Sequence, residues 1–332
     1  MNGNRGLRSG DAVEVRSAAE ILATLDENGT LDGMPFMPEM LEHVGQTFTV
    51  FRRVEKICDT AGGPTGARRM RGTVVLDDLR CDGSGHDGCQ AGCRFYWREQ
   101  WLRRTDDPVP ASPGPANALA ELERVTRGAT RITSEPDGGG VRYRCQATEA
   151  LAASTPMSKK DVRQFWREIA GGNLSVAHVL RVMARTLWHR FLRALGVRRQ
   201  LLLPPPSPET STAPANLGLQ PGDLVRVRSR EEVAETLTAH GRNRGLSFDP
   251  EMVPHCGETR CVLARVERFI DEPTGEMKTL QSDCLILDGV TCSGERGIWS
   301  ILFCPRGTYP WWREAWLRRV ENDVVPGDDP SR

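Results

Sequence analysis

Residues Cys81–Arg104 read CDGSGHDGCQAGCRFYWREQWLRR, and much of this stretch returns at Cys292–Arg319 as CSGERGIWSILFCPRGTYPWWREAWLRR. Both copies end in the run Trp-Arg-Glu-x-Trp-Leu-Arg-Arg, and both place cysteines upstream of it. The first copy holds three cysteines and the second holds two. The pattern predicts a duplicated unit in which a cysteine-lined loop leads into a tryptophan-rich strand.

The repetition extends upstream of the cysteines. Gly10–Ser17 and Gly222–Ser229 share the pattern GDxVxVRS, and Pro38–His43 and Pro250–His255 share PEMxxH. The matches keep their order through both halves of the chain and are much further apart than the repeats of solenoid proteins. The sequence therefore indicates two homologous domains in tandem.

Each repeat alternates short strand patterns with glycine-containing turns. The fold class expected is mainly β with α (α+β), as two homologous small SH3-like β-barrel or roll domains joined by a helical connector. The paired tryptophans are expected on one face of a closing strand, packed into the core. In the first repeat we expect strands at 12–16, 47–57, 73–76 and 95–102 and a helix at 18–25 that opens with a capping box at Ser17–Glu20.

Proline-rich segments divide the chain. Helices are expected near 117–127, 159–170 and 174–195, and the last of these has an apolar stripe that predicts docking onto the domains. The predicted organisation is a first Cys-rich β domain over 1–104, a linker over 105–116, the helical connector over 117–202, a linker over 203–218, a second Cys-rich β domain over 219–322 and a tail over 323–332.

The composition of the chain limits the cellular compartment and the classes of partner that we expect. The 332 residues carry no net formal charge, which argues against a general polyanion binder, so nucleic acid is not the expected partner. The amino terminus lacks a secretory apolar region and no apolar run is long enough to span a bilayer. We therefore expect a cytoplasmic protein, where ten cysteines indicate metal ligands or reactive thiols ahead of disulfides.

The cysteines group into two predicted sites, because tetrahedral thiolate ligation draws ligands from several chain segments joined by tight turns. Cys145 and Cys261 match neither set and are expected to be inert buried thiols. The first site comprises Cys58, Cys81, Cys89 and Cys93 with His43 and His86 as further candidates, and the second comprises Cys256, Cys284, Cys292 and Cys304 with His255 as a further candidate.

Zinc is the default ion, because it accepts such ligand sets without redox demands. An iron–sulfur cluster is the alternative, since four thiolates suit it equally. Simple burial of the thiols in the core is the non-metal interpretation.

The GDxVxVRS opening, the PEMxxHxG segment and the Cys-x7-Cys-x3-Cys-x3-Trp-Arg-Glu-x-Trp run resemble an uncharacterised bacterial family associated with biosynthetic or accessory gene neighbourhoods. The resemblance covers both repeats and Cys145–Glu149. It implies that the eight cysteines of the two predicted sites belong to the family pattern, and it brings no activity with it. Val44 stands where the family pattern has a cysteine.

The leading functional hypothesis is a metal-binding accessory or scaffold protein whose two domains bind another protein or a carrier-bound substrate. The first alternative is an iron–sulfur redox protein or enzyme. A third hypothesis is nucleic-acid binding or peripheral membrane contact through the Arg-rich stretch 174–199. Whether the protein is an enzyme stays open, because no nucleotide-binding or hydrolase motif is present.

Overall fold

The computed structural model describes residues 6–59, 66–77, 79–106, 115, 117–133, 141–158, 161–194, 216–296 and 302–320. The chain divides into two compact units. The first unit combines Met1–Gly196 with Glu267–Leu280 and Thr291–Tyr309, and the second combines Val197–Val266 with Gln281–Val290 and Pro310–Arg332. Two segments of the predicted second Cys-rich domain thus belong to the first unit. Most of the predicted linkers and the tail lie outside the described residues.

The main sheet of the first unit is antiparallel and open. Val13 and Val15 point into the core and are fully buried, which confirms the alternation expected there. The strand order is β8-β7-β4-β1-β9, formed by Trp97–Arg98, Thr73–Leu76, Thr47–Arg53, Ala12–Val15 and Leu102–Arg104.

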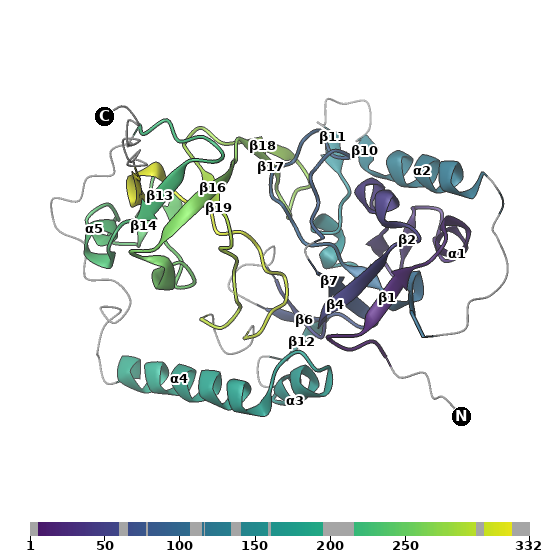
Figure 1. Cartoon of the computed structure of the whole chain (residues 1–332), viewed down its shortest axis with the longest axis horizontal. Helices are drawn as coiled ribbons and strands as arrows, with labels where there is room; N and C mark the ends of the chain where they lie inside the picture. Colours follow the sequence, from purple (N-terminus) through teal and green to yellow (C-terminus); the bar gives the residue numbers. More distant parts are fainter. Residues whose placement is uncertain are drawn as a thin grey trace, which may run out of the picture. The chain divides into compact units, whose positions relative to one another are not determined.

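Two helices cover part of this core. Helix α1 (Ala18–Leu22) begins at Ser17, and Ser17 and Glu20 form the predicted capping box. Such a cap contributes about 1 kcal/mol. Helix α2 (Ala118–Ala129) lies beside α1 (Figure 1) and buries Leu122. The segment predicted as a connector therefore supplies part of the first unit.

The two tryptophans of the first repeat are fully buried, but they do not share one strand. Trp97 lies in β8, whereas Trp101 ends the 3-10 turn η2 (Glu99–Trp101). The ring of Phe36 meets both indoles edge-on, with centroids 6.1 Å and 5.2 Å away. The predicted core role is confirmed, and the predicted continuous strand is wrong because a turn interrupts it.

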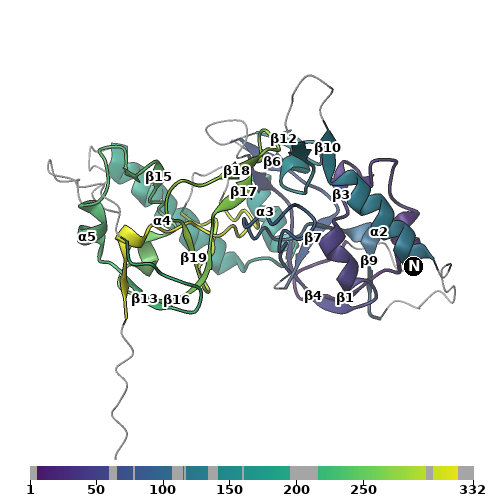
Figure 2. The same ribbon diagram turned by 90° about the horizontal axis from the view of Figure 1, so that it is seen from above.

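Smaller sheets complete the first unit. Strand β6 (Ala67–Arg69) pairs with β5 (Ile57–Cys58) and with β12 (Thr155–Met157), as Figure 2 shows for β6 and β12. Three hairpins and two 3-10 turns accompany them. They are β2 (Thr30–Leu31) with β3 (Met34–Pro35), β10 (Arg131–Thr133) with β11 (Val141–Tyr143), β17 (Arg268–Ile270) with β18 (Met277–Thr279), η1 (Pro38–His43) and η3 (Thr148–Ala150).

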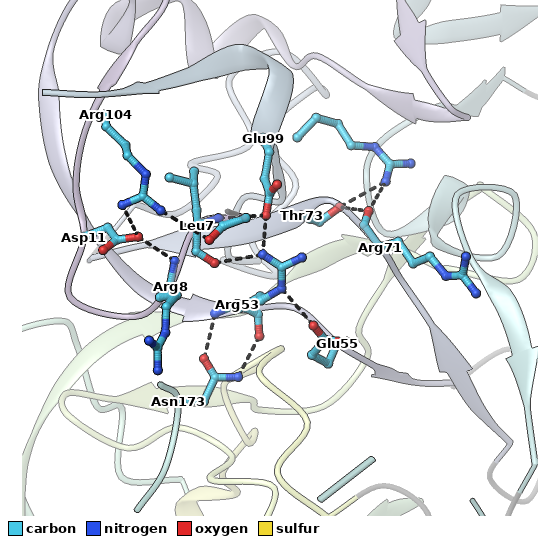
Figure 3. A network of polar contacts seen from close by, with 12 residues as sticks. Leu7, Arg8, Asp11, Arg53, Glu55, Arg71, Thr73, Glu99, Arg104 and Asn173 are labelled. Carbon is cyan, nitrogen blue, oxygen red and sulfur yellow. Dashed lines mark hydrogen bonds and ion pairs between the residues drawn. The ribbon is translucent and has the colours of Figure 1, made fainter. Parts of the chain in front are cut away.

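A polar network ties the end of β4 to distant segments (Figure 3). The Arg53 guanidinium binds the Glu99 and Glu55 carboxylates and the Leu7 carbonyl. The side-chain amide of Asn173 accepts a hydrogen bond from the Arg53 backbone nitrogen and donates one to its carbonyl, both at 2.8 Å. Asn173 thus replaces a neighbouring strand at this position.

Helices α3 (Arg163–Ala170) and α4 (Val176–Ala194) form a separate small core, in which Phe165, Val179 and Val182 pack against Leu302 and Phe303.

Beside this core lies a buried ion pair. Lys56 Nζ donates to Gln164 Oε1 at 2.7 Å and lies 4.0 Å from Glu168 Oε1. Burial lowers the pKa of Lys56 to about 8 and raises the pKa of Glu168 to about 7.

The shifted pKa of Glu168 predicts a pH-dependent stability. Between its ordinary value of 4.5 and the folded value of about 7, the folded state binds more protons than the unfolded state. The free energy of unfolding contributed by this group therefore falls as pH rises through that window, by up to about 3 kcal/mol. We expect Glu168→Gln to flatten the pH dependence of urea unfolding between pH 4.5 and 7. An unchanged slope in the variant would contradict this assignment.

The second unit has a four-stranded open sheet. Its core holds Val225, Phe248, Trp312 and Trp316. The sheet has the order β19-β16-β13-β20, formed by Leu285–Leu287, Thr259–Arg265, Leu224–Val227 and Leu317–Arg319. The unit also contains one helix, one hairpin and two 3-10 turns: α5 (Arg230–Ala234), β14 (Arg242–Asn243) with β15 (Leu246–Ser247), η5 (Val253–His255) and η7 (Glu314–Trp316).

The described residues form mixed α and β structure with mostly small antiparallel sheets, as the predicted α+β class requires. The expectation of a closed barrel is wrong for the part of the chain that is described, because every sheet there is open. The strands are short, and turns such as η2 interrupt them before they can close a barrel.

Candidate metal centre

A small cavity that is partly open to solvent lies in the first unit. Most of its wall is apolar. Four of its lining residues are cysteines, which come from the Cys-rich loop and from the segment before η3: Cys81, Cys89, Cys93 and Cys145. The structure thus brings together three of the four predicted ligands of the first site and adds one that the sequence grouping left out.

The fold of the Cys-rich loop positions the first three thiols. The Cys81 amide donates to the Cys93 carbonyl at 2.8 Å, which closes the loop at its base. Gly83 has φ +76°, and a β-carbon there would lie 2.0 Å from the Cys89 carbonyl oxygen. Only glycine fits this turn. The loop is therefore folded back on itself, and its three cysteines line the cavity.

Cys145 is fixed by its neighbour. The amide side chain of Gln146 accepts from the Tyr96 backbone nitrogen at 2.7 Å and donates to the Tyr96 carbonyl at 2.8 Å and the Pro35 carbonyl at 3.0 Å. Gln146 is buried, so these bonds are costly to lose. They hold the Cys145 segment against the chain that follows the Cys-rich loop.

A carboxylate and an imidazole adjoin the cavity at Cys81. Glu39 Oε1 accepts from His86 Nδ1 at 2.9 Å, from the Gly85 amide at 3.0 Å and from the Cys81 thiol at 3.4 Å. Both side chains are almost fully buried, and Glu39 Oε2 has no hydrogen-bond partner. The pKa of Glu39 lies below its ordinary value. Burial alone would raise this pKa, but the hydrogen bonds from His86 and Gly85 lower it by more.

Burial holds the thiols of Cys81, Cys93 and Cys145 in their neutral form. It raises the pKa of Cys81 far above the ordinary value, that of Cys93 to about 12 and that of Cys145 to about 11. Neighbouring thiols add to the shift, because a second thiolate would lie close to the first. Such cysteines are poor nucleophiles near pH 7, whereas a bound cation would favour the thiolates.

Cys58 lies at the end of β5, and the structure places it against Cys304. The Cys58 amide donates to Cys304 Sγ at 3.3 Å, and both residues belong to the first unit. Cys292 belongs to this unit too, where its amide donates to the Thr308 carbonyl.

The other two predicted ligands of the second site lie in the second unit. Cys256 packs against the core there, and Cys284 Sγ accepts from the Arg313 guanidinium at 3.3 Å. Cys284 and Cys304, which were predicted to share one site, thus belong to different units.

His43 and His255 do not line the cavity. His43 packs edge-on against Phe48, with ring centroids 5.4 Å apart, and burial lowers its pKa. His255 Nδ1 pairs with Glu258 Oε2 at 2.8 Å, and its ring meets Trp312 at 6.4 Å. Each histidine precedes the longest described strand of its unit and contacts an aromatic ring.

Helix α4 presents its apolar stripe outward. The face of the helix that is buried holds Val179 and Val182, which do not belong to the predicted stripe. The predicted docking of the whole stripe is therefore wrong. No helix among the described residues is long and apolar enough to cross a membrane. The side chains that remain more than half exposed are Val176, Leu180, Leu187, Trp188 and Phe191.

Comparison of the chain with protein-family models, with curated proteins and with solved structures finds no match.

Proposed function

We propose that the first unit binds an iron–sulfur cluster through Cys81, Cys89, Cys93 and Cys145, and that the protein is a redox or accessory protein built around this cofactor. The observation that carries the proposal is the position of four thiols on the wall of one apolar, partly open cavity. Four cysteine thiolates are the usual ligand set of such clusters.

The spacing of the thiols favours a cluster over a single zinc ion. With Zn–S bonds of about 2.3 Å, tetrahedral geometry brings the ligating sulfurs to about 3.8 Å from one another. Among the described residues, only one set of three or more side chains of His, Cys, Asp or Glu has ligand atoms that all lie within 4.8 Å of one another. That set contains one cysteine, Cys81, so the four thiols are not gathered that closely. A cluster accommodates a wider arrangement, because its thiolates are shared among two or four irons instead of meeting at one ion.

The surroundings of the thiols suit a redox cofactor. The Ile270 amide donates to Cys89 Sγ at 3.4 Å, and hydrogen bonds to ligating sulfurs tune the reduction potential of a cluster. The apolar wall keeps water away, while the partial opening leaves a route for electrons to a partner. A partner protein or a carrier-bound substrate would approach this opening.

A zinc site is the second candidate, and one observation favours it. Glu39 Oε1, Cys81 Sγ and a ring nitrogen of His86 lie within 4.8 Å of one another. Three protein ligands with a fourth open position are typical of catalytic zinc. The unpartnered and buried Glu39 Oε2 is an atom that a cation would satisfy.

Two variants separate these candidates, because Cys89 belongs only to the cluster set and His86 only to the zinc set. We expect Cys89→Ser to lose most of the iron and sulfide that the full chain takes up in anaerobic reconstitution, while His86→Gln keeps them. Elemental analysis and visible absorption measure the outcome. A colourless protein that binds one zinc per chain, and that loses it in His86→Gln but not in Cys89→Ser, would replace the cluster proposal by the zinc site.

We further infer that the two units descend from one duplicated SH3-like roll. Matched registers support this, since Ala12 pairs with Thr49 in the first unit as Leu224 pairs with Cys261 in the second. Matched side-chain contacts support it as well. The indoles of Trp101 and Trp316 donate to Thr24 and Thr236, each at 3.0 Å, and Arg53–Glu99 corresponds to Arg265–Glu314.

A further inference from the structure

A second pair of thiols meets in the first unit, and it includes none of the cysteines in the proposed cluster site nor their neighbours in sequence. Cys58 ends β5, and Cys304 comes from a segment almost 250 residues later in the chain. The Cys58 amide donates to Cys304 Sγ at 3.3 Å, which brings the two cysteines into direct contact. Both are free thiols in this structure.

The chain around Cys304 is held tightly. Gly294 has φ +70°, and a β-carbon there would lie 2.7 Å from the Cys304 amide nitrogen. Phe303 is fully buried with φ +68°, which is uncommon for a residue other than glycine. Cys304 is itself buried, so this thiol has little freedom to turn away from Cys58.

Cys58 is the accessible member of the pair. It lines a small, partly open cavity together with Arg306 and Glu272. The Arg306 guanidinium reaches the Cys58 carbonyl at 3.4 Å and pairs with the Glu272 carboxylate. The hydrogen bond from Cys304, assisted by this buried cation, lowers the pKa of Cys58 and raises that of Cys304. One half-buried and activated thiol beside one buried thiol is the arrangement of a thiol–disulfide exchange pair.

We propose that Cys58 and Cys304 form a redox-active dithiol that exchanges with external disulfides. The geometry assigns Cys58 as the attacking thiol and Cys304 as the resolving thiol. This function is separate from the proposed cluster, which uses four other cysteines.

The exchange needs one co-reactant, a low-molecular-weight disulfide. The Cys58 thiolate attacks one sulfur of that disulfide, breaks its S–S bond and releases one thiolate. The Cys304 thiol then loses its proton and attacks the Cys58 sulfur, which forms the Cys58–Cys304 disulfide and releases the second thiolate. Two electrons pass from the dithiol to the external disulfide, and two protons end on the released thiols.

The test equilibrates the full chain anaerobically with mixtures of reduced and oxidised glutathione, quenches with acid and maps the cysteines by peptide mass spectrometry. We expect Cys58–Cys304 to be the first intramolecular disulfide to form. In Cys304→Ser that disulfide is lost, and one glutathione accumulates on Cys58. In Cys58→Ser the incorporation of glutathione falls about tenfold, because the thiol that lies beside the buried Arg306 guanidinium is lost.

Cys261→Ser is the matched control, since Cys261 lies in β16 of the second unit and should leave all three results unchanged. A first disulfide that joins other cysteines, or equal incorporation of glutathione in Cys58→Ser and the unmodified chain, would overturn the proposal. Loss of bound iron in these variants would affect the cluster proposal instead, so the two tests stay distinct.

Discussion

Replacing Cys145 by serine is expected to lower the iron content of the reconstituted full chain by roughly tenfold or more. Losing a ligand should weaken metal binding at least as much as losing a residue that only hydrogen-bonds to a ligand. The side chains of serine and cysteine have nearly the same size, so the Gln146 contacts that hold this segment should survive. The visible absorption of the cluster should disappear with the iron. Far-ultraviolet circular dichroism checks that the fold remains.

Cys261→Ser serves again as the control, because Cys261 lies outside the first unit. It should bind as much iron and sulfide as the unmodified chain. If Cys145→Ser bound the same amount as Cys261→Ser, Cys145 would be no ligand and the four-thiol site would fail.

Trp101→Ala is expected to reduce the free energy of unfolding of the first unit by about 3 to 5 kcal/mol. The indole is fully buried, packs edge-on against Phe36 and donates to the Thr24 hydroxyl, so its removal leaves a cavity and takes away one of the two hydrogen bonds of that hydroxyl. Such a loss is a large share of the stability of a typical domain. Hydrogen exchange followed by mass spectrometry should show faster exchange in peptides of β1, β4 and β7.

Trp316→Ala is the matched variant, because Trp316 makes the corresponding contacts with Phe248 and Thr236 in the second unit. It should accelerate exchange in β13 and β16 and leave β1 and β4 protected. The same set of peptides destabilised by both variants would contradict a division into two units of independent stability.

Local features of the fold could be predicted from the sequence. The alternation over Ala12–Val15, the capping box at Ser17 and the strand at Thr73–Leu76 appear as expected. In each case the residues that decide the structure are close in sequence. Sequence spacing did not reveal the 3-10 turn between Trp97 and Trp101, because two aromatic residues four apart suit either a strand or a turn.

The grouping of the cysteines could be predicted only in part. Three ligands of the proposed cluster lie in one loop, where short spacing brings them together. Cys145 comes from a segment outside the repeats, and the shared triplet Cys-Gln-Ala at Cys89 and Cys145 is the one sequence feature that links them. Cys58 meets Cys304 through long-range packing, which no local spacing encodes.

Helix α4 shows the same limit. Periodicity predicted a helix with an apolar stripe, and the helix is present over Val176–Ala194. Periodicity does not say which face is covered, and here Val179 and Val182 pack inward while Leu180 and Leu187 stay exposed.

The most direct test of the four-thiol cofactor site is the iron and acid-labile sulfide content of the full chain purified without oxygen, combined with Mössbauer spectroscopy. We predict a brown protein with iron and sulfide in equal amounts, in a cluster whose irons all carry thiolate ligands. A colourless preparation without sulfide, or one that holds only zinc, would contradict the central claim.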